Sequence, residues 1–164
     1  MTVAANSSPL VILAKLGYFD LLNRLYRRVY ISAEVYHEVV VAGVGLPGAA
    51  EVEKASWVEV KKLHNQADLF EARQKHALGD GELSTILLAK ELRANVALLD
   101  DHNARKLARA YGLQVRGSVG LLETFYIKGY LPDLRPAFRQ LLAHSYIDRQ
   151  LLDLRLRALG FPCL

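Results

Sequence analysis

Short runs of apolar residues alternate along this chain with segments whose apolar residues recur at helical spacing. Residues 29–31 are β-branched and aromatic, and residues 96–99 are continuously apolar, which is typical of a strand covered on both faces in a parallel sheet. Strands that alternate with helices pair in parallel through helical crossovers. The sequence therefore predicts an α/β protein in which helices cover both faces of a central, mostly parallel sheet.

Turn and capping residues divide the chain into expected elements. Ser7 or Ser8 is expected to cap a helix that carries Pro9 in its first turn and ends at Gly17. The expected strands are residues 2–5, 29–31, 57–60, 96–99 and 114–116. The further expected helices are residues 19–26, 64–77, 82–93 and 103–111, a short one that ends near Ser56, one from Ser118 onward, and C-terminal helices broken at Pro132 and Pro136.

Neither an internal repeat nor a linker divides the 164 residues, of which 52% are hydrophobic. A chain of this size and composition can bury most of its unfolded surface in one core. We therefore expect a single domain over residues 1–164, with residues 130–164 as a helical extension packed on it.

The cysteine count and the charge exclude several classes of protein. Cys163 is the only cysteine, so neither an intramolecular disulfide nor a cysteine-based metal cage can form, and a cytoplasmic location is expected. The apolar run at residues 9–16 lacks a basic leader and is too short to span a bilayer, so no membrane is expected as a partner. The net charge of +4 favours polyanions such as nucleic acids, although charge runs usually lie on solvated surface.

Polar side chains follow two of the expected strands at the point where each strand ends. Asn6 and Ser7 follow the first strand, and Asp100 and Asp101 follow the fourth. Because ligands of open parallel sheets bind at the carboxyl ends of the strands, we expect these side chains in one functional region. Glu82 opens the helix before the fourth strand, and its carboxylate can point toward the same edge.

A further acidic position comes from the helix that Ser32 is expected to cap. Glu38 lies between Val35 and Val39 on the apolar face of this helix, where a carboxylate is costly to bury without a cation or a donor. Converging carboxylates also repel one another, and a divalent cation is a common remedy. Hard oxygen ligands of this kind suit Mg²⁺ or Mn²⁺.

Structural roles compete with metal binding at several of these residues. Asp80 is expected to serve a loop or a cap, and Glu82 in a first helical turn is favoured by the helix dipole alone. One of Asp100 and Asp101 is expected to cap the following helix while the other faces the site. The histidines lack metal-ligand spacing and are expected at the surface or in the core. His102 alone lies beside the site and is a candidate contact to phosphate. The five are His37, His64, His76, His144 and, beside the site, His102.

Five short motifs occur in a fixed order. They are Asn6-Ser7-Ser8-Pro9-Leu10, Val-Tyr-His-Glu-Val within residues 31–39, Leu78-Gly79-Asp80-Gly81-Glu82, Leu98-Leu99-Asp100-Asp101 with Ala104-Arg105, and Gly117-Ser118-Val119-Gly120-Leu121-Leu122. In these motifs, and over most of its length, the chain resembles the PIN-domain superfamily, particularly its small prokaryotic PIN-like branch. The resemblance implies a three-layer α/β/α fold with additional C-terminal helices. It also implies an Mg²⁺- or Mn²⁺-dependent ribonuclease of a class common among the toxins of toxin-antitoxin pairs.

The resemblance also implies roles for single residues. The implied catalytic acids are Glu38, Glu82 and, for the last acid, Asp100 or Asp101. The implied metal ligands are these positions and Asn6. The implied contacts to substrate are Ser7, His102 and Ser118. Asn6 departs from the family pattern, because the first acid of such a site is usually a direct metal ligand. The amide oxygen of Asn6 can still bind a hard cation, but one negative charge is lost.

Three hypotheses follow for the function. The first is a metal-dependent endoribonuclease weakened by Asn6, and the second is a degenerate module that binds nucleic acid or protein without catalysis. In the third, the acids serve only caps and internal salt bridges. The expected partners are RNA, an antitoxin protein and a second copy of the chain. Leucines of the early helices suit a homodimer, although packing within the domain explains them as well; they are Leu10, Leu13, Leu21, Leu22 and Leu25.

Overall fold

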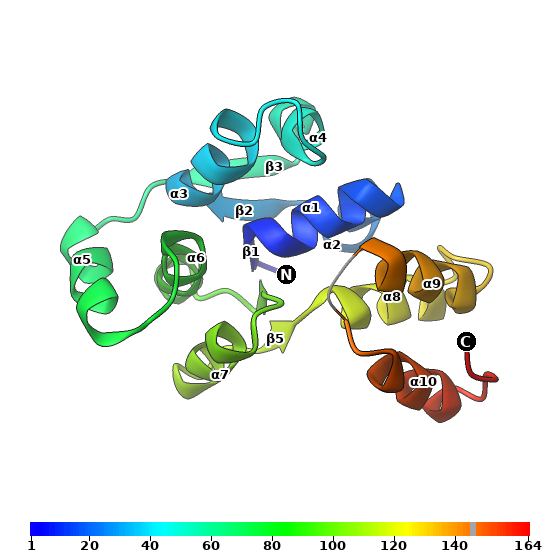
Figure 1. The fold of residues 1–164 in the computed structure, drawn as a ribbon. Coiled ribbons are helices and arrows are strands. Elements are labelled where there is room, and N and C mark those ends of the chain that lie inside the picture. Colours follow the sequence, from blue (N-terminus) through cyan, green and yellow to red (C-terminus); the bar gives the residue numbers. More distant parts are fainter. Residues whose placement is uncertain (145–146) are drawn as a thin grey trace. The chain divides into compact units, whose positions relative to one another are not determined.

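The structure, a computed structural model, describes residues 1–144 and 147–164. The chain forms two compact units, Met1–Ser118 and Val119–Leu164. Figure 1 shows the elements of both units in chain order. The first unit contains the sheet and every acid of the candidate site.

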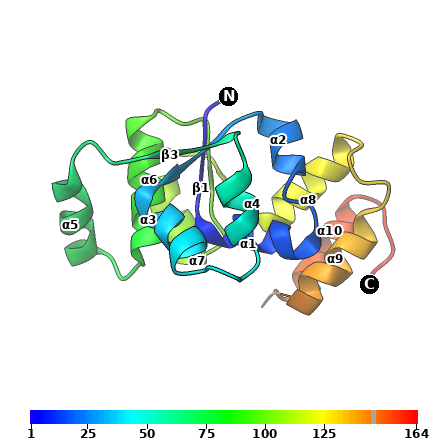
Figure 2. The same ribbon diagram turned by 90° about the horizontal axis from the view of Figure 1, so that it is seen from above.

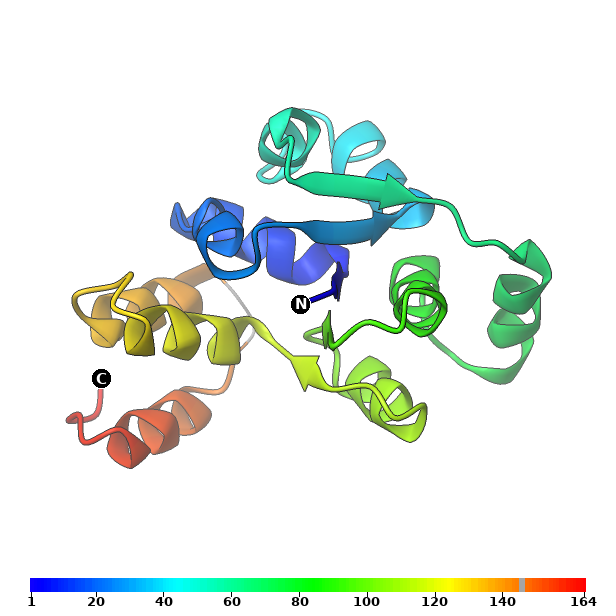
Figure 3. The same ribbon diagram turned by 180° about the vertical axis from the view of Figure 1, so that it is seen from behind.

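The first unit is built on a five-stranded sheet whose paired strands are all parallel, in the order β3-β2-β1-β4-β5. Figure 3 shows β2 and β3 side by side, with their arrowheads pointing the same way. The predicted α/β class with a parallel sheet is confirmed, and each strand begins and ends within one residue of its predicted position. The strands are β1 (Val3–Ala5), β2 (Val29–Ser32), β3 (Val58–Lys61), β4 (Val96–Leu98) and β5 (Val115–Arg116).

Strand β1 lies at the centre of the sheet, between β2 and β4. Val3 pairs with Val96 and Ala5 with Leu98, and every residue of β1 and β4 is buried. This burial explains why both strands are continuously apolar rather than alternating. Because the two strands run in the same direction and in register, the residues that follow them leave the sheet at one edge.

Helices connect the strands of the first unit. Figures 1 and 2 show α5 beside α6, and the two helices pack together. The helices of the first unit are α1 (Ser7–Leu16), α2 (Leu21–Tyr26), α3 (Ala33–Tyr36), the π-helical turn η1 (His37–Val41), α4 (Ala49–Lys54), α5 (Gln66–Lys75), α6 (Asp80–Glu91) and α7 (His102–Ala110). Helix α8 (Ser118–Ile127) begins at the last residue of this unit, and α9 (Leu134–His144) and α10 (Arg149–Ala158) belong to the second.

Helix α6 is buried on most of its circumference and packs on β1, β2 and β4. Leu83 and Leu88 belong to a cluster that α5 completes, whereas Ile86 belongs to a cluster rich in alanine from β1, β4 and α7. The small alanine side chains let the helices approach the sheet closely. The buried members of the second cluster are Ala4, Ile86, Ala89, Ala97, Leu99, Ala104 and Ala108.

Two predicted details are wrong. Neither Ser7 nor Ser8 caps α1, because Asn6 occupies the N-cap position, without a capping hydrogen bond from its side chain, and both serine hydroxyls bind carboxylates. Pro136 does not break the last helices, since it is the third residue of α9. At that position a proline costs no hydrogen bond, because the first N–H groups of a helix have no intrahelical partner. Pro132 precedes α9, as predicted.

The second unit is helical, and an ion pair joins two of its helices. Arg155 of α10 donates two hydrogen bonds to the Glu123 carboxylate of α8, at 2.6 and 2.8 Å. The predicted helical extension contains α9 and α10, while residues 145–146 lie outside the described residues. Within the described ranges, no helix is long and apolar enough to cross a membrane.

The burial of α6 predicts the cost of truncating it. Ile86 is 1% exposed, and Ile86→Ala is expected to lower the free energy of unfolding by about 2–5 kcal/mol, from lost apolar burial and the cavity left behind. Leu87→Ala on the same helix removes a side chain that is only half-buried and should cost less than half as much. Chemical denaturation measures both, and equal losses would contradict this account of the core.

Candidate active site

The carboxyl edge of the sheet brings together the ends of β1 and β4. The Asn6 N–H donates to the Leu98 carbonyl oxygen at 3.0 Å, which continues the pairing of these strands beyond β1. Two residues further on, Ser8 Oγ donates to Asp100 Oδ2 at 2.9 Å. The predicted meeting of the residues after the first and fourth strands is therefore observed, and a hydrogen bond joins them directly.

Asn6 and Glu38 meet at Gly81, in the first turn of α6. A side chain at Gly81 would place its Cβ 2.6 and 2.8 Å from the two carboxylate oxygens of Glu38 and 3.0 Å from Asn6 Oδ1. These three oxygens therefore converge on one small space, which remains open because residue 81 is glycine. Ser7 Oγ donates to Glu38 Oε2 at 2.6 Å and orients the carboxylate there.

Asn6 Oδ1 is the polar atom that most requires a ligand in this space. The residue is 5% exposed, and this oxygen is buried without a hydrogen-bond partner in the part of the chain that the structure describes. A buried acceptor without a donor costs about 1–3 kcal/mol, and a neighbouring carboxylate adds repulsion. Amide and carboxylate oxygens are ligands that Mg²⁺ and Mn²⁺ accept. The donor set of Asn6 and Glu38 therefore fits a divalent cation.

Asp100 is held by serine donors from two elements. Ser118 donates from its backbone N–H to Oδ1 and from its hydroxyl to Oδ2, both at 2.7 Å, and Ser8 also donates to Oδ2. These three hydrogen bonds fix the position of the carboxylate. Ser118, which the resemblance suggested as a substrate contact, orients an acid in this structure.

Glu82 and Asp101 each cap a helix. Glu82 Oε2 accepts from the Gly79 N–H at 2.8 Å at the start of α6, and Asp101 Oδ2 accepts from the Ala104 N–H at 2.9 Å at the start of α7. The prediction that one aspartate of the pair caps the following helix is confirmed. Among the described residues, no three His, Cys, Asp or Glu side chains lie close enough to hold a metal by themselves.

Electrostatic repulsion still links Glu82 to the other acids. Burial raises the pKa of Glu82, the hydrogen bond from Gly79 opposes this rise, and the charges of Asp101 and Glu38 add to it. Glu82 is therefore within the electrostatic range of both acids. A cation bound nearby would relieve this repulsion.

Glu38 differs from its predicted setting. The side chains of Val35, Val39 and Val40 are buried, but Glu38 is exposed. Its helix changes from α to π geometry at His37, and the wider turn moves Glu38 out of the buried stripe. The prediction that Glu38 is buried, and needs a partner for that reason, is therefore wrong. The carboxylate does nevertheless have a donor, Ser7. Single π turns often occur at functional sites.

Buried hydroxyls fix α3 against α6, which sets Glu38 opposite Gly81. Ser32 caps α3 as predicted, accepting from the Val35 N–H, and its hydroxyl also bonds to the Ser84 hydroxyl at 2.7 Å. Thr85 Oγ1 donates to the Gly81 carbonyl oxygen at 2.7 Å. Sequence reasoning missed Ser8, Ser84 and Gly81 as contributors. The tandem Ser7-Ser8 after a strand was a usable signal for Ser8. Gly81 stands in the motif at residues 78–82, but the motif does not indicate that Asn6 and Glu38 meet there.

An open cleft of about 320 Å³ lies beside Glu38, lined also by Ala33, Glu34, His37 and Asp80. Asp80 opens α6 and accepts two hydrogen bonds from Arg73, at 2.7 and 2.8 Å, which lower its pKa. This ion pair agrees with the structural role expected for Asp80. The histidines of the described chain are exposed or, for His76, half-buried, and His102 stands exposed at the first position of α7.

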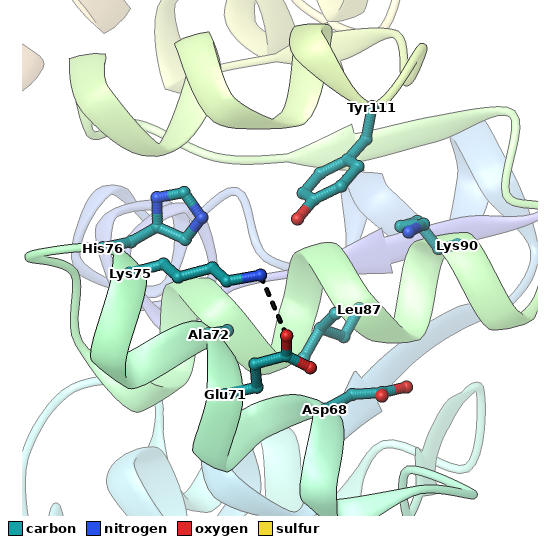
Figure 4. Close-up of a pocket in the computed structure, with 8 residues that line it drawn as sticks. All are labelled: Asp68, Glu71, Ala72, Lys75, His76, Leu87, Lys90 and Tyr111. Carbon is teal, nitrogen blue, oxygen red and sulfur yellow. Dashed lines mark hydrogen bonds and ion pairs between the residues drawn. The ribbon is translucent and has the colours of Figure 1, made fainter.

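A second cleft, of about 180 Å³, lies between α5, α6 and the end of α7 (Figure 4). Its charged groups already have partners. Lys75 forms an ion pair with Glu71 at 2.9 Å, and Lys90 Nζ lies 4.2 Å from the centre of the Tyr111 ring. Because these cations are engaged within the cleft, it is a weaker candidate for a functional site than the carboxyl edge.

The all-parallel sheet and its helices define an α/β protein. The oxygens of Asn6 and Glu38 at the carboxyl edge of this sheet form a candidate cation site. The PIN domain model matches residues 2–160, and the chain belongs to the PIN domain family. This nuclease-like family generally uses divalent metal. A PilT N-terminus domain protein from the hyperthermophilic archaeon Sulfolobus solfataricus has a similar structure, with a TM-score of 0.56 and 18% identity, covering 76% of this chain and 92% of that one. No curated protein matches the chain.

The space at Gly81 predicts a selective effect on cation binding. Gly81→Ala places a methyl group between Asn6 Oδ1 and the Glu38 carboxylate, so Mn²⁺ affinity is expected to fall by at least roughly tenfold, as for the loss of one charge-assisted contact. The fold should survive, because alanine favours a helix and the exposed Glu38 end can move aside. Titration calorimetry with Mn²⁺ and thermal unfolding test this, and unchanged affinity would contradict the placement of the cation.

The raised pKa of Glu82 predicts how stability without metal depends on pH. The folded chain binds this proton more tightly than the unfolded chain, so ionised Glu82 destabilises the fold above the folded pKa, and this penalty disappears below the unfolded value of about 4.3. Glu82→Gln should therefore have a higher Tm than the wild type at pH 7 in chelator. The difference should close near pH 4, and a constant difference from pH 7 to pH 4 would rule out this origin.

Proposed function

We propose that the chain is a metal-dependent endoribonuclease of PIN type, whose cation is held between Asn6 and Glu38. The observation that carries the proposal is the buried, unpartnered Oδ1 of Asn6 facing the Glu38 carboxylate in a member of a nuclease-like family. Mg²⁺ and Mn²⁺ are the proposed cations, because the ligands are hard oxygens. The proposed ligand set also includes the neighbouring acids Glu82, Asp100 and Asp101.

Within this ligand set, three of the acids also have separate tasks. Glu38 and the Asn6 amide would hold the cation, which would supply Lewis acidity at this edge. Asp100, oriented by Ser8 and Ser118, adds a fixed negative charge at the same edge. Glu82 holds the start of α6 in place through its bond to Gly79, which keeps Gly81 opposite Glu38.

A degenerate PIN domain that binds RNA without cutting it is the second candidate function. The neutral Asn6 favours it, because a neutral ligand in place of an acid weakens attraction for a divalent cation. The side chains that meet Gly81 supply one carboxylate and one amide. A cation held by few ligands would be bound weakly, and the site would then act through its polar surface and the net charge of +4.

Variants at the cation site separate the two functions. With Mn²⁺ and single-stranded RNA, the wild type is expected to cleave, Glu38→Gln to lose at least roughly a hundredfold in kcat because a ligand charge is gone, and Asn6→Asp to gain in Mn²⁺ affinity and cleavage. Glu53→Gln, which removes an exposed carboxylate on α4, is the matched control. Each reaction is followed by gel separation of labelled RNA.

The outcomes of that assay are distinct. Cleavage that is equal in the wild type and Glu38→Gln would sink the endoribonuclease proposal and identify a contaminating nuclease. Absence of cleavage in the wild type together with cleavage by Asn6→Asp would establish the degenerate module and assign its inactivity to the missing charge. Loss of activity in Glu53→Gln equal to that in Glu38→Gln would mean that net charge, not metal ligation, is being measured.

Several predictions from the sequence stay predictions within this proposal. They are the single domain over residues 1–164, a toxin role with an antitoxin partner, a cytoplasmic location, substrate contacts by Ser7, His102 and Ser118, and a homodimer. For the homodimer, Leu10, Leu13 and Leu22 are fully buried in the described chain, which favours the alternative that these leucines pack within it.

A further inference from the structure

Arg105 is a cation at the acidic edge that has no carboxylate partner within residues 1–144 and 147–164. It is the fourth residue of α7 and is half-buried. Its guanidinium makes one long hydrogen bond, from Nη1 to the Leu99 carbonyl oxygen at 3.4 Å, and no ion pair with any residue in the described ranges. By contrast, Arg73 pairs with Asp80 at 2.7 Å, although nearly half of each side chain is exposed to solvent.

The nearest acid to Arg105 is already satisfied by other groups. The charge of Asp100 acts on Arg105, but its two oxygens accept hydrogen bonds from Ser8 and Ser118. Two serine hydroxyls and one backbone N–H thus hold Asp100, and Arg105 donates none of these hydrogen bonds. Most of the five guanidinium donors are consequently available to a ligand.

Gly117 provides the space that keeps the guanidinium beside this acid. A side chain at Gly117 would collide with Arg105 Nη1 and come within 3.0 Å of Asp100 Oδ1. Both groups therefore lie against the same stretch of backbone, between the end of β5 and the start of α8. Arg105 is held near the acids without being neutralised by them.

We propose that Arg105 binds a phosphate oxygen of RNA at the candidate active site. The inference rests on the proposed function and adds a substrate-binding residue to it. A planar guanidinium with free donors matches the paired oxygens of a phosphodiester. A cation between Asn6 and Glu38 would attract the same anionic backbone, so a strand of RNA is the ligand that both parts of the edge can bind.

The test measures RNA binding apart from cleavage. Fluorescence anisotropy with a labelled, mixed-sequence single-stranded RNA is carried out in EDTA at several salt concentrations. Arg105→Gln is expected to weaken binding roughly tenfold, and to reduce the slope of log affinity against log salt by about 0.7, the contribution of one contact to single-stranded phosphate. Arg105→Lys should recover part of the affinity, because it keeps the charge but not the forked geometry.

The matched control is Lys106→Gln. It removes the same charge from the same helix, at an exposed neighbour about 100° around the helix axis, and should change RNA affinity less than twofold. The affinity for Mn²⁺ alone and the Tm should be unchanged in Arg105→Gln. This readout separates a contact to RNA from a structural role.

Three results would overturn the inference. They are equal RNA affinity and salt slope in the wild type and Arg105→Gln, an equal loss in Lys106→Gln, and a loss of Mn²⁺ binding or thermal stability in Arg105→Gln. Failure of the wild type to cleave RNA would sink the endoribonuclease proposal alone, because binding in EDTA decides the role of Arg105 without any cleavage.

Discussion

The parallel pairing of β1 with β4 is the constraint on which the rest of the first unit depends. It continues one residue past β1, through the hydrogen bond from the Asn6 N–H to the Leu98 carbonyl oxygen. Because both strands end together, the two segments that follow them must diverge from one point, and their polar side chains meet there. The bond from Ser8 to Asp100 and the orphaned oxygen of Asn6 are consequences of this shared ending.

The acids at this edge serve the fold and the candidate site at once. Asp101 and Glu82 satisfy the N–H groups that helix starts leave unpaired, while Asp100 is held by serines and Glu38 by Ser7. Such bonds hold the carboxylates in fixed positions close to one another. Asn6 is neutral, so it lacks the negative charge that an acid would carry at this position. The missing charge lessens the repulsion among the carboxylates when no metal is bound, and it also weakens the attraction for a cation.

Local rules of sequence interpretation predicted most of the fold. Strands β1 and β4 are buried on both faces, so their continuous apolar runs predicted them correctly. The helix caps at Ser32 and Asp101 also agree with what their side chains predicted. The same rules failed at Ser7 and Ser8, whose hydroxyls found carboxylates across the sheet edge instead of the backbone beside them. They also failed at Pro136, because a proline in a first turn does not break a helix.

The sequence by itself determined the α/β class, the order of strands and helices, and the identity of the polar residues that end β1 and β4, because periodicity and capping are local properties. Only the tertiary structure decided which of those residues meet. The exposure of Glu38 depends on a π turn. The convergence of Asn6 and Glu38 depends on the absence of a side chain at Gly81. Arg105 is left unpaired because distant serines donate to Asp100. The last two are contacts between segments far apart in the chain, which no local pattern records.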